Sequence, residues 1–316
     1  MRKSMVMAGS LSRPLVTLTS IALVAFAAAL AGCGDDQDRD RAVNPATGGA
    51  TASLTAGKAQ RVADLVPPSI AGDGKIVVAM DASYPPNEFF SEDGKTIVGM
   101  DPDMAKALGE VMGLDVELEN VTFDAILPGL KAGKFELAMS SLTDTKEREK
   151  AVDMVTYLTA GTKFYTAADS PTDIGGLADL CGKTVAIEKG TTQADDAAVQ
   201  SKKCEAAGDK PVDIDVYPDQ NGANLALNSG RAQVGMADSP VVAYIVAQSG
   251  GRLTETGEDY GTAPYGIAVN KDSGFSEAIL AAVKALISGG QYAAILDKWN
   301  LADGGIDVPK VNNAVE

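Results

Sequence analysis

The sequence predicts an α/β fold of two lobes, each with a mainly parallel sheet flanked by helices, and a cleft between the lobes. The chain has 316 residues, which is too long for one small core and suits two domains of ordinary size. Short apolar runs alternate with segments of helical periodicity, which is the pattern of βαβ units and parallel sheets. Because this alternation occurs in two successive series, we expect two lobes.

The first series extends from Ile76 to about Thr145, and one of its helices has clear start and stop signals. Asp101-Pro102 places an acceptor at the N-cap and a proline at the first helical position, and Gly113 ends this helix. The other elements expected here are strands at Ile76–Met80, Val116–Leu118 and Phe135–Ser141, and helices over Phe123–Ala132 and from about Thr145.

The second series begins at Lys183 and follows the same alternation. The strands expected in it are Lys183–Lys189, Asp213–Tyr217, Gln233–Ala237 and Gly266–Asn270. The helices expected in it are Gln193–Ala206, Gly222–Ser229, Pro240–Gln248, a long helix with apolar residues at helical spacing from Phe275 to Ile287, and Tyr292–Trp299.

Residues 1–32 have the pattern of a secretory signal. Three basic residues among the first 13 precede a mostly apolar run from Leu15 to Ala31. Cys33 directly follows small residues, which resembles the lipobox of bacterial lipoproteins, where the thiol receives a diacylglycerol and becomes the new N-terminus. An uncleaved membrane anchor is the alternative, since about 17 residues is the lower limit for a spanning helix. Residues 33–72, charged and then rich in small residues, are expected to be the lipidated cysteine and a disordered tether.

The composition excludes several kinds of chemistry. The net charge is −16, and removal of residues 1–32 makes it −19, which argues against binding of nucleic-acid phosphates. The chain contains no histidine, which removes Ser-His-Asp catalysis and histidine metal sites. We expect no metal and no cofactor.

Two cysteines remain after the lipobox, Cys181 and Cys204. An even pair in an exported protein indicates a disulfide, which contributes roughly 3 kcal/mol through loop entropy. Two buried free thiols are the alternative.

Six stretches of the folded region resemble the solute-binding family 3 group, the polar amino-acid-binding proteins of bacterial importers. Ser140–Arg148 (SSLTDTKER) matches the family pattern S-x-T-x-T-x-x-R, and Phe123–Gly133 is similar to W/F-D-x-L-I-P-x-L-x-x-G. The other stretches follow the family's order: Asp81–Glu88, Val98–Ala105, Gly182–Thr192 and Asn228–Pro240. The resemblance covers residues 74–300.

The resemblance implies a periplasmic-binding-protein-like fold of type II. Lobe 1 would comprise residues 73–163 plus 264–316, and lobe 2 residues 164–263, with hinges near Gly161–Phe164 and Thr262–Gly266. It also implies an extracytoplasmic, lipid-anchored monomer that delivers a free amino acid to an ABC permease and its ATPase.

An amino-acid zwitterion needs a cation for its carboxylate and an anion for its ammonium. By resemblance, Arg148 clamps the carboxylate with its planar fork, and Asp238 takes the ammonium. The alternatives are a surface salt bridge of Arg148 with Glu147 or Glu149, and a helix cap for Asp238. Further polar contacts are expected from Ser140, Ser141 and Thr143 in lobe 1, and from Thr191 and Thr192 at a helix start that favours anions but also suits plain capping.

Tyr84 and Phe123 resemble the aromatic pair that encloses the ligand side chain, although Phe123 alone would suit a core. Asp81, Asn87, Glu88 and Glu188 are expected to set specificity. Asn87 stands where the family commonly has an aromatic residue, so one wall of the pocket is expected to be more polar. Asp81 and Glu188 make the pocket negative, which favours Lys, Arg, ornithine or Gln, unless Glu188 points at Lys189 or solvent.

Two other functions are compatible with this resemblance. Cyclohexadienyl dehydratases resemble these binding proteins, and Glu188 or Glu88 would then act as a general acid. A sensory lipoprotein would report the amino acid to a partner instead of delivering it.

Overall fold

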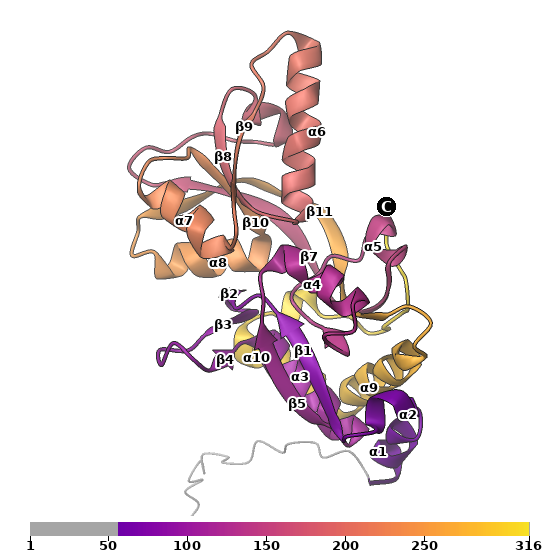
Figure 1. The fold of residues 1–316 in the computed structure, drawn as a ribbon. Coiled ribbons are helices and arrows are strands. Elements are labelled where there is room, and N and C mark those ends of the chain that lie inside the picture. The colour runs from indigo at the N-terminus through magenta and orange to yellow at the C-terminus, as the bar shows by residue number, and fades with distance from the viewer. Residues whose placement is uncertain (1–55, 316) are drawn as a thin grey trace, which may run out of the picture. The chain divides into compact units, whose positions relative to one another are not determined.

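The computed structural model of the chain describes residues 56–315 (Figure 1). The expected signal peptide, Cys33 and the first part of the expected tether lie outside these residues. The rest of the expected tether is not disordered: α1 (Ala56–Ala63) and α2 (Pro68–Ala71) are helical. Val62 and Val66 are buried in the lobe 1 core, so the tether prediction is wrong for residues 56–72.

The described strands form an eight-stranded mixed sheet in the order β5-β1-β6-β11-β7-β10-β8-β9. Its lobe 1 strands are β1 (Lys75–Met80), β5 (Asp115–Asn120) and β6 (Leu137–Ala138). Its lobe 2 strands are β8 (Thr184–Glu188), β9 (Asp213–Tyr217) and β10 (Val234–Asp238). All pairings within each of these groups are parallel, as the sequence predicts.

Two long antiparallel strands, β7 (Val152–Ala167) and β11 (Leu253–Asn270), join the two groups. The sequence indicates only the end of β11, because glycines and acidic residues interrupt its first half. Gly257 and Gly261 adopt positive φ, and the register of the pair shifts on both sides of Tyr260. The predicted hinge segments coincide with this irregular region, and their movement stays a prediction.

Helices cover both groups of strands (Figure 1). In lobe 1 these helices are α3 (Met100–Met112), α4 (Phe123–Lys131), α5 (Lys146–Glu149), α9 (Phe275–Gly289) and α10 (Gln291–Trp299). In lobe 2 they are α6 (Thr192–Ala207), α7 (Gln220–Asn228) and α8 (Ser239–Gln248). Two short 3₁₀ helices, Leu177–Leu180 and Ala302–Gly304, complete the described elements. Among residues 56–315 no single helix is long and apolar enough to cross a membrane, although α9 and α10 together pass that test across a bend of 80°.

The start of α3 differs from the prediction. The helix begins at Met100 with Gly99 as its N-cap, so Asp101 lies inside the helix. The Asp101 side chain is buried and accepts hydrogen bonds from the Tyr157 hydroxyl and the Ser141 backbone N–H. Asp101 is buried and does not cap the helix, because the Tyr157 hydroxyl and the Ser141 N–H that bind its carboxylate lie on the core side.

A small three-stranded sheet, β2 (Ser83–Tyr84), β3 (Glu88–Phe90) and β4 (Ile97–Val98), places lobe 1 residues against lobe 2. Tyr84 belongs to a hydrophobic cluster made otherwise of lobe 2 residues, among them Tyr165 and Leu227. The Ser83 hydroxyl accepts a hydrogen bond from the backbone N–H of Gln220, the first residue of α7, at 3.1 Å. The two lobes are therefore in direct contact through β2.

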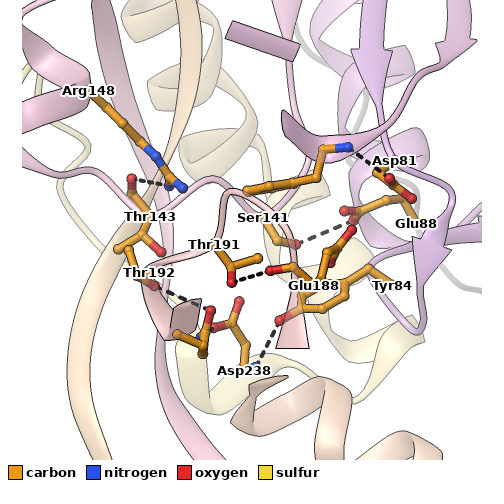
Figure 2. Close-up of a pocket in the computed structure, with 12 residues that line it drawn as sticks. Asp81, Tyr84, Glu88, Ser141, Thr143, Arg148, Glu188, Thr191, Thr192 and Asp238 are labelled. Atoms are coloured by element: carbon orange, nitrogen blue, oxygen red, sulfur yellow. Dashed lines mark hydrogen bonds between the residues drawn. The ribbon is translucent and has the colours of Figure 1, made fainter. Parts of the chain in front are cut away.

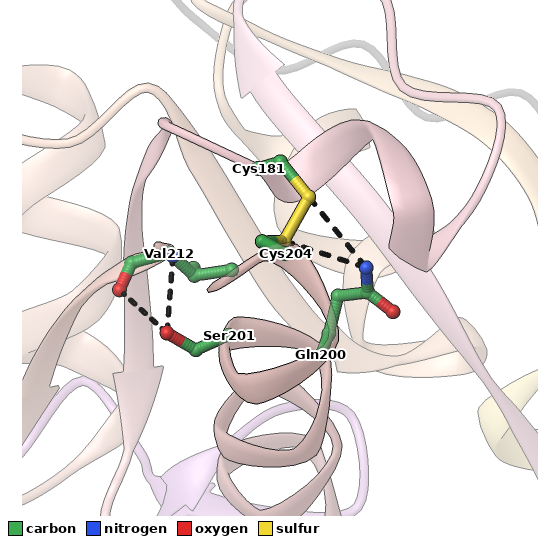
Figure 3. Close-up of a disulfide and its surroundings, with 5 residues drawn as sticks. All are labelled: Cys181, Gln200, Ser201, Cys204 and Val212. Carbon is green, nitrogen blue, oxygen red and sulfur yellow. Dashed lines mark hydrogen bonds between the residues drawn. A yellow bond between two sulfur atoms is a disulfide. The ribbon is translucent and has the colours of Figure 1, made fainter. Parts of the chain in front are cut away.

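Cys181 and Cys204 form a disulfide with a Cα–Cα distance of 5.6 Å, as predicted (Figure 3). Cys181 follows the first 3₁₀ helix, and Cys204 lies in the last turn of α6. The Gln200 side-chain amide lies beside both sulfur atoms. The closed loop contains β8 and most of α6, and the corner between them carries candidate site residues.

Candidate ligand-binding site

A cavity of about 300 Å³ lies between the lobes. It is lined by Asp81, Tyr84, Glu88, Phe123, Ser141, Thr143, Arg148, Glu188, Thr191, Thr192, Gln193 and Asp238 (Figure 2). All the predicted site residues except Ser140 and Asn87 belong to this lining. Ser140 lies behind it, where its hydroxyl accepts from the Asp81 backbone N–H and donates to Glu88, both at 2.9 Å.

Arg148 comes from α5, a short helix capped by the Thr145 side chain. Its guanidinium lies over the Phe123 ring at 5.4 Å from the ring centroid. It donates to the carbonyl oxygens of Thr143 at 2.8 Å and Gly190 at 3.2 Å. A guanidinium has five N–H donors, so donors remain for a ligand carboxylate. The expected alternative, a salt bridge with Glu147 or Glu149, is wrong, since those carboxylates pair with Lys150 and Lys146.

The first turn of α6 faces the same end of the cavity. Thr191 is the N-cap: its hydroxyl accepts from the Ala194 N–H at 3.3 Å and donates to the Glu188 carbonyl at 2.9 Å. Thr191 therefore both caps α6 and lines the cavity, two roles that are compatible in the sequence analysis. The first N–H groups of a helix have no intrahelical partner, which makes this end of α6 favourable for an anion.

Asp238 ends β10 and precedes α8, but its carboxylate turns away from that helix. Its Oδ1 accepts from Gln193 Nε2 at 2.7 Å, and its Oδ2 accepts from the Tyr265 hydroxyl at 2.6 Å. Burial raises the pKa of Asp238 to about 6, against the lowering effect of these hydrogen bonds and of Arg148. The capping alternative for Asp238 is wrong.

Gln193 is a lining residue that the sequence prediction missed. Its amide donates to Asp238 and, at 2.9 Å, to the Thr162 hydroxyl in β7. The only signal in the sequence was its place next to Thr191 and Thr192 at the expected start of a helix. An amide at such a place is usually solvated, so its role follows from the fold and not from local pattern.

Three acidic side chains gather at the other end of the cavity (Figure 2). Glu188 ends β8, is 2% exposed, and its Oε1 has no hydrogen-bond partner among the described residues. Burial, followed by the charges of nearby carboxylates, raises the pKa of Glu188 well above its ordinary value. Asp81 accepts the Phe123 backbone N–H at 2.9 Å, and burial raises its pKa as well. Glu188 therefore points neither at Lys189, which pairs with Asp124, nor into solvent.

Glu88, the third of these acidic side chains, is part of a buried network with Asp101. It accepts from Ser140 at 2.9 Å and Ser141 at 3.3 Å, and burial together with Asp101 raises its pKa well above its ordinary value. A carboxyl group in this setting is held in its neutral form. Glu88 thus adds hydrogen-bonding groups to the cavity, and Asp81 and Glu188 are the carboxyl groups there that can ionise beside a bound cation.

Asn87 does not form a polar wall of the cavity, contrary to the prediction. It is fully buried, and its amide donates to the Ser141 hydroxyl at 2.7 Å. It supports Ser141 from behind instead. The Asn87 backbone N–H donates to the Tyr84 carbonyl at 3.0 Å, which closes a turn at Pro85–Pro86 between the two residues.

The cavity is polar at both ends, and the two ends favour ligand groups of opposite charge. Figure 2 shows Arg148, Thr143 and Thr192 on one side, and Asp81, Glu88 and Glu188 on the other. The first group suits an anionic oxygen, and the second suits a cation. A molecule that carries both charges, separated by a chain of several bonds, would complement this cavity.

The chain is similar in sequence and in fold to known proteins. The family model of the bacterial extracellular solute-binding proteins, family 3, matches residues 76–302. The chain belongs to this family. The arginine-binding protein ArgT of Corynebacterium glutamicum is 35% identical over 249 residues, which cover 78% of this chain and 81% of that protein.

Solved structures confirm the two-lobed fold of this family 3 protein. An ancestral arginine-binding protein bound to arginine superimposes with a TM-score of 0.65 at 32% identity, over 72% of this chain and 98% of that chain. The ancestral amino acid-binding protein AncCDT-1, described as a precursor of cyclohexadienyl dehydratase, gives a TM-score of 0.65 at 31% identity, over 73% and 97%.

Proposed function

We propose that this protein captures a free amino acid with a cationic side chain, arginine first among them, and delivers it to an ABC permease and its ATPase. Cys33 carries the lipid anchor in this proposal, and the protein works as an extracytoplasmic monomer. The observation that carries the ligand assignment is the buried Glu188 carboxyl opposite Arg148, whose Oε1 has no hydrogen-bond partner among the described residues. The named ligands of ArgT and of the ancestral protein support it.

The ligand lies in one orientation. Arg148 and the first turn of α6 bind its carboxylate, Asp238 binds its ammonium, and Tyr84 and Phe123 enclose its carbon chain. Glu188 and Asp81 then receive the guanidinium. A cation there lowers the pKa of Glu188, so its carboxyl group ionises on binding. Lysine and ornithine fit the same pattern, and glutamine fits without the second charge.

Binding is coupled to closure because the contacts come from both lobes. Arg148 and Ser141 belong to lobe 1, whereas Glu188, Thr191 and Asp238 belong to lobe 2. A ligand that bridges both lobes stabilises the closed form, which is how periplasmic binding proteins in general close at a hinge. The closed form then docks on the permease. A micromolar Kd corresponds to about −8 kcal/mol, which two desolvated charge pairs and aromatic burial can supply.

The test is isothermal titration calorimetry with the twenty amino acids on protein that lacks residues 1–33. Arginine is expected to bind most tightly, lysine and ornithine more weakly, and glutamate not at all. Arg148→Ala is expected to weaken arginine binding strongly but to leave it measurable. Full affinity in that variant, or a preference for acidic amino acids, would contradict the proposal.

A dehydratase is the second candidate. The structural likeness to AncCDT-1 favours it, and so does a Glu188 whose raised pKa would let it act as a general acid. Incubation with prephenate or arogenate, followed by ultraviolet absorbance of an aromatic product, separates the two functions. Product formation would replace the transport proposal.

A further inference from the structure

The segment Lys310–Ala314, here called the strap, returns from lobe 1 to the central strand β7. Val311 forms an antiparallel bridge with Val155. The backbone of Lys310 exchanges hydrogen bonds with Thr156, each at 2.9 Å. These bonds occupy hydrogen-bonding groups along one edge of β7, just before the stretch that pairs with β10. The strap therefore extends the sheet locally.

Asn312 fixes the register of the strap. Its backbone N–H donates to the Met154 carbonyl at 2.8 Å, and its side-chain Oδ1 accepts from the Met154 N–H at 2.9 Å. Its side-chain Nδ2 donates to Asp153 at 3.0 Å. Asn312 thus binds β7 through its backbone N–H and through both ends of its side-chain amide. The next two residues lead away from the sheet.

These next two residues reach the segment that carries Arg148. The Asn313 N–H donates to Asp144 Oδ2 at 2.8 Å, and the Ala314 N–H donates to Glu149 Oε1 at 2.9 Å. Asp144 precedes the N-cap of α5 and Glu149 is its last residue, so the strap binds both ends of this helix. In Figure 1 the end of the chain lies beside α5.

The helix α5 needs such support. It has four residues, none of them buried, and a single turn is not stable by itself. Further fixed points of this segment include the Asp144 N–H on the Pro264 carbonyl at 2.8 Å and the Lys271 ammonium on the Glu149 carbonyl at 2.7 Å. The strap supplies the contacts to the two side chains that flank Arg148.

We propose that the strap is a positioning element that holds Arg148 in the geometry needed to clamp the ligand carboxylate. This inference deepens the proposed function and rests on it. Within residues 56–315, none of the strap's hydrogen bonds goes to a residue that lines the cavity, so it acts through Asp144, Glu149 and the short helix between them. Loss of the strap leaves the guanidinium present but less well placed.

The first experiment removes the strap by a stop codon after Lys310. Titration calorimetry with arginine is expected to show about tenfold weaker binding, a usual size for coupling within one hydrogen-bond network. Agmatine, which is arginine without its carboxylate, is expected to bind the truncated and the full protein equally. In an Arg148→Ala background, truncation is expected to cause no further loss.

A milder pair of variants keeps the strap in place. Glu149→Ala removes the acceptor of the Ala314 N–H, whereas Glu149→Gln removes the same charge and keeps an acceptor. The alanine variant is expected to weaken arginine binding about threefold, and the glutamine variant to bind like the parent. Lys146→Ala, which breaks the 3.1 Å salt bridge with Glu149 without touching the strap, serves as a further control.

The outcomes separate the inference from the proposed function. Unchanged arginine affinity in both the truncated protein and Glu149→Ala would overturn the strap's role. Equal losses for arginine and agmatine, or an equal loss with and without Arg148, would also overturn it, since they indicate a general structural effect. Full arginine affinity in Arg148→Ala would instead overturn the carboxylate clamp, and the role of the strap with it.

Discussion

The Tyr84 hydroxyl accepts a hydrogen bond from the backbone N–H of Asp238 at 2.8 Å, which joins β2 of lobe 1 to the β10–α8 junction of lobe 2. The two residues are 154 positions apart and both are buried. One of them forms an aromatic wall of the cavity and the other is the expected partner of the ligand ammonium. The residues that we expect to contact the ligand therefore also hold the lobes together.

Removal of this hydroxyl should weaken ligand binding. Tyr84→Phe keeps the aromatic wall, but the Asp238 N–H then loses its partner on closure, which costs about 1 kcal/mol and lowers arginine affinity about fivefold. Titration calorimetry measures the change. Tyr260→Phe is the matched control, because its hydroxyl bonds Asp196 within lobe 2 at 3.0 Å. Equal affinity of Tyr84→Phe and parent would show that this bond does not contribute to the closed, ligand-bound form.

Glu188 should decide between basic and neutral ligands. Glu188→Gln has the same shape but cannot ionise, so arginine affinity should fall by about tenfold or more while glutamine affinity changes little. Competition binding with both amino acids gives the ratio directly. The exposed Glu255→Gln removes the same charge far from the cavity and should change neither affinity. A parallel loss for both ligands in Glu188→Gln would place Glu188 outside the side-chain subsite.

Arginine affinity should rise as the pH increases from 5 to 7. The free protein holds a proton on Asp238 up to about pH 6, because burial raises the pKa of this group. The ligand ammonium favours the carboxylate, so the bound form holds fewer protons and binding releases one. The raised pKa of Glu188 acts in the same direction. Calorimetry at pH 6 in two buffers of different protonation enthalpy measures this release, and proton uptake on binding would contradict the assignment.

The disulfide should stabilise the β8–α6 corner. Replacement of Cys181 and Cys204 by alanine should lower the free energy of unfolding by about 3 kcal/mol, the usual effect for a loop of this length. Urea unfolding followed by circular dichroism measures the change, and the parent protein treated with a reductant should match the double variant. An unchanged unfolding free energy in both would mean that the crosslink contributes nothing to stability.

The parallel strands and most helices could be predicted because they follow hydrophobic periodicity. The expected strand Lys183–Lys189 agrees closely with β8, and Gly113 follows the helix that it was expected to end. The first half of β11 could not be predicted, since its glycines and acidic residues are typical of a loop. It becomes a strand because β7, rich in β-branched and aromatic residues, pairs with Leu253–Thr256 and again with Tyr260.

The candidate site also contains residues that the sequence predicts and residues that it does not. Arg148, Asp238 and the threonines were found through motif order, which records residues that the fold brings together. Gln193 and the Glu88–Asp101 network depend on contacts between segments distant in sequence, and no local pattern predicts them. Asp101 was interpreted as a cap because its neighbour is proline, yet Tyr157 and Ser141 determine where its side chain lies.

A crystal structure of the protein with arginine tests the central claim most directly. The ligand carboxylate should bind the Arg148 guanidinium, its ammonium should bind Asp238, and its guanidinium should lie against Glu188 and Asp81 in the cavity between the lobes. Arginine bound outside this cavity, or bound in it with its carboxylate toward Glu188, would contradict the account.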